Sequence, residues 1–158
     1  MLRATAFALA MLSVFSAPAF AAGLKATQSV EVATVSVNAD GAESITFAPA
    51  TDVEPGEQVR YRLAYTNEGA DAADKVSLVM PVPVEVTYLE GSVDGNPGLV
   101  TFSSDNGTTF ADRETVLVTD GKADRVATAE EITHIKWVFD QPIAPAESGT
   151  ISFMAVLR

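Results

Sequence analysis

The chain contains no cysteine and a single histidine, His134, among its 158 residues. Without cysteine there is no disulfide and no lipid-modified cysteine, so stability has to come from packing alone. One histidine cannot supply the three or four nitrogen or sulfur ligands of a stable zinc or copper site. The sequence also lacks a G-x-S-x-G motif that would pair a serine nucleophile with His134. We therefore expect no catalytic residue, no cofactor and no enzyme activity.

Positive charge is scarce as well. The chain has 10 Lys and Arg against 21 Asp and Glu, for a formal net charge of −11. Phosphate backbones and anionic lipid headgroups would repel a domain this acidic, which disfavours both nucleic-acid binding and peripheral membrane attachment. We therefore expect no nucleic acid among its partners. Paired carboxylates could in principle hydrolyse glycosides, but nothing in the sequence selects a pair. The acidity is best explained by solubility.

Long apolar runs are absent after the first residues, and the apolar run that is present has the order of a secretory signal. Arg3 precedes an apolar stretch at 4–15, and Ala19 and Ala21 occupy the small-residue positions of a cleavage site before Ala22. The stretch is shorter than the roughly 20 residues of a membrane span. The sequence predicts a signal peptide at 1–21, one domain at 22–158, export to the periplasm or the cell exterior, and no stable membrane insertion.

Alternating apolar and polar residues dominate the rest of the chain, which predicts strands with one buried face. Val59, Tyr61, Leu63 and Tyr65 alternate with polar residues, and the same pattern returns at 76–80, 84–88, 133–139 and 151–157. A short strand is expected at 45–47. At 30–37 the alternation changes parity between Val32 and Val35, which suggests a bulge or a twist.

Glycine-containing turns separate these runs at intervals of about 8–12 residues, the spacing of a sandwich or barrel. The fold class expected from these runs is all-β, with seven to eight antiparallel strands in a sandwich or a barrel. Trp137, the only tryptophan, lies on the apolar side of its run, so it should fill the middle of the core.

Several landmarks occur in an order that resembles a known family. They are the segments VEPGEQVRY at 53–61, YTNEG at 65–69, PVP at 81–83, YLEGS at 88–92, and Trp137 followed by SGTI at 148–151. Over about residues 50–158 the chain resembles one copy of domain-of-unknown-function family eleven, the bacterial conserved-repeat domain. The resemblance implies an immunoglobulin-like sandwich. Ala146-Glu147 departs from it, because the family commonly has Pro-Gly before the last strand.

The residues in these landmarks suit structural roles. Pro55 fixes a backbone angle at a turn and Gly56 gives freedom before the next strand. Asn67 can hydrogen-bond backbone two residues on and tolerates left-handed geometry, which suits a turn that includes Gly69.

The segment SSDNGTTF at 103–110 is similar to the Asp-box hairpin of sialidase-type propellers. In that pattern Asp105 accepts hydrogen bonds from turn amides, Gly107 permits the reversal and Phe110 packs back on the strand. One copy cannot build a propeller. The segment is therefore interpreted as a structural hairpin.

Two ligand alternatives stay open at this point. Calcium could bind Asp94, Asp105, Asp112 and Asp120 in the acidic loops around 94–120, although no D-x-D-x-D-G spacing is present. A glycan could stack on Tyr61, Tyr65, Tyr88 and Phe102, although aromatic residues at strand spacing usually form core.

The leading expectation is an exported, non-catalytic structural or interaction module whose partner is another envelope or surface protein. A calcium- or glycan-binding module is the alternative.

Overall fold

The computed structural model describes residues 23–37, 40–95, 98–119, 121 and 123–158. The expected signal peptide, its cleavage site between Ala21 and Ala22, and Asp120 lie outside the described residues. Within this part of the chain, no helix has the length and apolarity needed to cross a bilayer.

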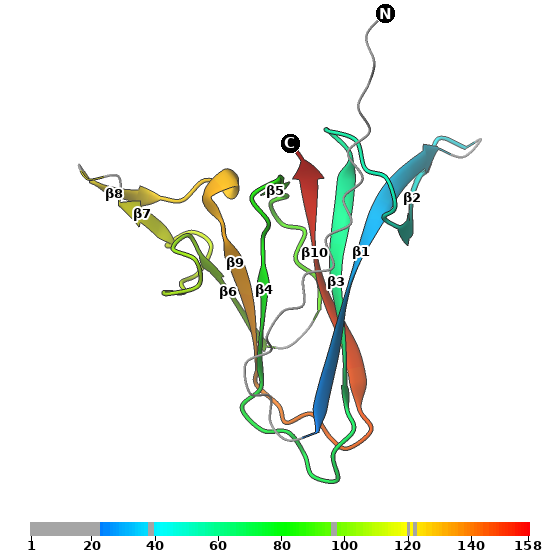
Figure 1. Cartoon of the computed structure of the whole chain (residues 1–158), viewed down its shortest axis with the longest axis vertical. Helices are drawn as coiled ribbons and strands as arrows, with labels where there is room; N and C mark the ends of the chain where they lie inside the picture. The colour runs from blue at the N-terminus through cyan, green and yellow to red at the C-terminus, as the bar shows by residue number, and fades with distance from the viewer. Residues whose placement is uncertain (1–22, 38–39, 96–97, 120, 122) are drawn as a thin grey trace, which may run out of the picture.

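The fold is all-β and its strands pair antiparallel. The larger sheet has the strand order β2-β1-β3-β10-β5 (Figure 1). Its strands are β1 (Leu24–Val37), β2 (Glu43–Pro49), β3 (Gln58–Asn67), β5 (Val86–Tyr88) and β10 (Ser148–Leu157).

A second sheet has the order β4-β9-β6, and a third pairs β7 with β8. These strands are β4 (Ser77–Pro81), β6 (Gly98–Ser103), β7 (Leu117–Thr119), β8 (Asp124–Val126) and β9 (His134–Phe139), and a short 3₁₀ helix, η1, covers Ala129–Glu131.

The structure describes ten strands, more than the seven or eight that alternation predicts. β7 and β8 have three residues each, too few to show a period. The last three residues of β6 are all buried, so this strand has no alternation to detect.

The two larger sheets share one core. Val59, Tyr61 and Leu63 of β3 are buried, whereas Arg60 and Arg62 between them lie partly exposed. Tyr61 stacks on Phe153 of β10 with ring centroids 5.0 Å apart. Trp137 of β9 is 0 % exposed and belongs to the same buried cluster, as expected. Its indole N–H has no hydrogen-bond partner among the described residues.

Of the bulge or twist that the sequence suggests in β1, the bulge is wrong. Its registers run unbroken, pairing with β3 from Leu24 to Val32 and with β2 from Glu31 to Val37. Val30 and Val32 pack against the core, whereas Val35 and Val37 are exposed. The parity changes because β1 continues beyond the end of β3 and its apolar side chains move to the other face. In Figure 1 this part of β1 leans with β2 away from the other strands.

Candidate functional site

The turn at 103–110 is organised around the Asp105 carboxylate. Asp105 Oδ1 accepts hydrogen bonds from Ser103 Oγ at 2.7 Å and from Thr108 N at 3.1 Å. Thr109 donates its backbone N–H to Oδ1 at 2.9 Å and its hydroxyl to Oδ2 at 2.7 Å. These bonds, with those of Thr109 the largest, lower the pKa of Asp105 to about 2. Asp105 therefore stays ionised and holds the turn.

Left-handed backbone at the tip reverses the chain in this turn. Asn106 and Gly107 have φ of 58° and 78°. Phe102 and Ala111 then exchange backbone hydrogen bonds of 2.8 and 3.0 Å. Phe110 lies below the ammonium of Lys136 on β9, 4.0 Å from the ring centroid, so it packs on the outer surface of the second sheet. This geometry is that of a structural hairpin.

Two other acidic residues proposed for calcium, Asp94 and Asp112, take part in backbone hydrogen bonds. Asp94 bridges Ser152 through its backbone, and its Oδ1 accepts the N–H of Gly95 at 2.8 Å. The Asp112 carbonyl accepts the amides of Thr115 and Val116. In the described ranges, no three His, Asp or Glu side chains gather to hold a metal ion.

His134 lies beside the same turn. A Cβ added to Gly107 would come within 3.4 Å of the imidazole Cγ. Burial lowers the pKa of His134, and the nearby Asp105 carboxylate acts in the opposite direction. Its Nδ1 lies 3.2 Å from the Thr133 hydroxyl. The ring fills the space beneath the turn.

Two of the landmark segments, at 53–61 and 65–69, contain turns. Pro55 and Gly56 are the central residues of a turn closed by Glu57 N–H on the Glu54 carbonyl at 3.0 Å, with φ of 95° at Gly56. Asn67 is 1 % exposed, and its Oδ1 accepts the N–H of Gly69 at 2.9 Å.

The amide group of Asn67 also donates to the carbonyls of Asp71 at 2.9 Å and Ile143 at 2.8 Å. The expected hydrogen bond to the backbone two residues on is confirmed, whereas the left-handed geometry that Asn67 tolerates is not used, because Asn67 is the last residue of β3. The Asn67 side chain therefore connects the turn after β3 to the segment before β10 by hydrogen bonds to three backbone groups.

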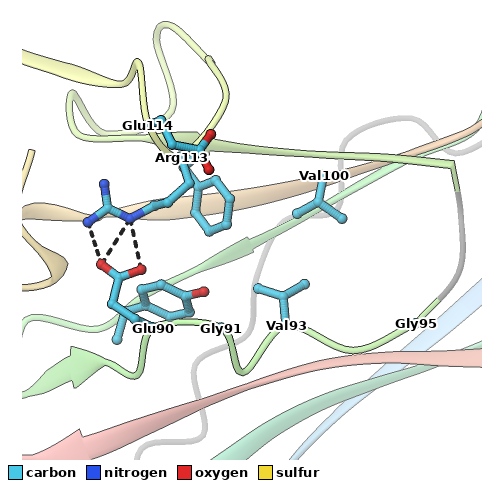
Figure 2. A pocket seen from close by; sticks show the side chains of 9 residues that line it. Glu90, Gly91, Val93, Gly95, Val100, Arg113 and Glu114 are labelled. Atoms are coloured by element: carbon cyan, nitrogen blue, oxygen red, sulfur yellow. Dashed lines mark hydrogen bonds and ion pairs between the residues drawn. The ribbon is translucent and has the colours of Figure 1, made fainter. Parts of the chain in front are cut away.

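A cavity of about 420 Å³ opens between the loop after β5 and the residues around β6 (Figure 2). Val93 and Val100 point toward each other from opposite walls, and Arg113 faces Glu90 at one end. The Arg113 guanidinium forms a bidentate ion pair with Glu90 and donates to the Ala127 carbonyl at 2.9 Å. This cation is therefore already engaged within the protein, and the cavity has both apolar walls, from Val93 and Val100, and a charged end that also includes Glu114.

The aromatic residues considered for glycan stacking are core residues. Tyr61, Tyr88 and Phe102 are buried, and Tyr65 packs partly buried against the core. Burial and the neighbouring Glu90 raise the pKa of Tyr88. Tyr88 and Phe102 also line the cavity described above, but these residues are only 3 % and 7 % exposed.

The exposed surface with the clearest apolar character lies on the part of β1 and β2 that extends beyond β3. We call residues 33–37 and 43–47 the arm. Val35 and Ile45 are paired partners on its outer face, with Val37 next to them, and these three side chains are 52 %, 51 % and 64 % exposed. We call them the apolar strip.

The base of the arm is anchored to the rest of the sheet. The Arg60 guanidinium lies 3.5 Å from the centroid of the Phe47 ring and forms an ion pair of 2.6 Å with Glu31. Beyond Phe47 the arm is a two-stranded ribbon. Sequence reasoning missed this surface, although the parity change between Val32 and Val35 is its signal.

Neither a family model nor a curated protein nor a solved structure matches this chain.

Proposed function

We propose that the protein is an exported, non-catalytic, immunoglobulin-like β-sandwich module of the cell envelope that binds another protein through the arm. The observation that carries the proposal is the apolar strip, three strand-forming side chains each at least half exposed on a projecting ribbon. Export and envelope location rest on the signal-like sequence at 1–21.

Burying such side chains is favourable by about 1.5–3 kcal/mol for a fully exposed Val or Ile, and about half of that is available here. A two-stranded ribbon is by itself only marginally stable in water. A partner that covers the strip would therefore stabilise the arm and be held by it.

The composition of the arm also favours a protein partner. No Lys, Arg, Asp or Glu occurs at 32–37 or at 44–51, in a chain of which 20 % is charged. Protein interfaces exclude charged residues from their centres in the same way. A surface without cations would attract neither nucleic acid nor anionic lipid.

Site-specific photo-cross-linking in the producing cell tests the proposal. A photoreactive residue at Val35 should give a discrete cross-linked species, because this side chain lies on the covered face. The matched control is Thr34, the adjacent exposed residue on the opposite face of the ribbon. Equal cross-linking at both positions, or none at Val35, would show that the strip is not a binding surface.

A further inference from the structure

The outer face of the larger sheet has a linear pattern of charge. Glu43 lies at the far end of the arm, paired with Val37, and the apolar strip follows it. Arg60 and Arg62 lie beyond the base of the arm on the same face, since Arg60 pairs with Glu31 and contacts Phe47. The order along this face is acid, apolar, base (Figure 1 shows the strands).

Two of these charges have no local counterpart. Glu43 and Arg62 form no ion pair within the described ranges, although the sheet face carries the Glu31–Arg60 pair between them. Arg62 is only partly exposed, with its neighbours Ser29 and Ser152 in the adjoining strands. An opposite charge supplied from outside would therefore complement each end.

An acid–apolar–base pattern is complementary to itself when it is reversed. Resting on the proposed function, we infer that the partner of the arm is a second copy of this chain, packed face to face and antiparallel. A two-fold axis near the apolar strip covers Val35, Val37 and Ile45 with the same residues of the other copy. It also moves each Glu43 toward the base of the other arm, where Arg60 and Arg62 lie.

The net charge of the chain makes this face more suitable than other faces for contact between two copies. Two copies of net charge −11 repel each other over most of their surfaces. The middle of the arm carries no charge, and its acidic end is moved toward two cations, Arg60 and Arg62, of which only Arg60 is already paired with a carboxylate, that of Glu31.

Sedimentation velocity on the purified protein, over a roughly hundredfold range of concentration, measures the association. We expect a monomer–dimer equilibrium. Val35→Glu should raise the dissociation constant about a hundredfold, because it buries a charge in the apolar centre. Thr34→Glu, one residue away on the other face, should leave the dissociation constant within about a factor of three, as expected of a change outside the interface.

Charge reversal tests the antiparallel orientation. Glu43→Arg and Arg62→Glu should each weaken the dimer, and the double variant should restore it, because the reversed pair is again complementary. A monomeric wild-type protein would overturn the inference, as would a dimer that is insensitive to Val35→Glu or not restored by the double variant. Cross-links from Val35 to a different protein, with a purified monomer, would overturn self-association alone. No cross-link and no dimer would overturn the proposed function too.

Discussion

At the scale of single residues, the most informative position is one that has the wrong residue type for its backbone. Ala146 has φ of 61°, in the left-handed region that a side chain disfavours. It is held there because its N–H donates to the Asn67 carbonyl at 2.8 Å.

Ala146→Gly should therefore raise the free energy of unfolding by about 1 kcal/mol, because relief of the left-handed penalty exceeds the extra entropy of glycine in the unfolded chain. Denaturant titration measures the change. The control is Ala144→Gly, at a neighbouring residue without positive φ, which should lower the free energy of unfolding by about 0.5 kcal/mol. A loss at both positions would contradict this account of Ala146.

Residue-scale chemistry was partly readable from the sequence. The bonds of Asp105 and the bond between Asn67 and Gly69 are local, so they could be expected from the sequence, whereas the bond from Asn67 to the Ile143 carbonyl joins distant segments and could not. The left-handed backbone of Ala146 could not be predicted from the sequence, because alanine does not favour that conformation.

At the scale of elements, the turn at 103–110 shows how one carboxylate can hold a chain reversal. Four donor groups point at Asp105, and its pKa of about 2 lies well below the ordinary 3.8. Because the pKa is lower in the folded state, ionised Asp105 stabilises the fold above about pH 4. That contribution is lost as the pH falls through about 2.

Asp105→Asn should remove this part of the pH dependence. Urea unfolding followed at a series of pH values between about 2 and 5 should give a shallower slope for the variant than for wild type. Asp112→Asn is the control, because the Asp112 side chain accepts no hydrogen bond from the described residues while its carbonyl does. An unchanged slope in Asp105→Asn would mean that other carboxylates dominate acid unfolding.

Element prediction from sequence succeeded where strands are long and one face is buried, as in β3 and β9. It failed for β7 and β8, where three residues cannot show a period. For β1 the change of parity was detected, but of the two explanations suggested for it, a bulge or a twist, the bulge is wrong. A change of parity can mean an extra residue in the ladder or a change of buried face, and only the position of β3 decides between them.

At the scale of the whole molecule, the two larger sheets approach each other along the edges formed by β5 and β6. Tyr88 and Phe102 meet across this opening with ring centroids 5.6 Å apart. Outside them, Glu90 follows β5 and Arg113 follows the turn after β6. This sheet-to-sheet closure joins residues that are far apart in sequence, so no local pattern could predict it.

The Glu90–Arg113 pair should accordingly stabilise the fold more through Arg113 than through Glu90. Glu90 is 51 % exposed, so Glu90→Ala should cost about 1 kcal/mol or less. Arg113 is 20 % exposed and also donates to the Ala127 carbonyl, so Arg113→Ala should cost about 2 kcal/mol. A double-mutant cycle by denaturant unfolding separates the ion pair from the carbonyl bond. If the arginine clamps both the loop after β5 and the residue after β8, Arg113→Ala must still destabilise the protein in a Glu90→Ala background. If Arg113→Ala causes no further loss of unfolding free energy in the Glu90→Ala background, the contribution of Arg113 is that of a surface ion pair alone.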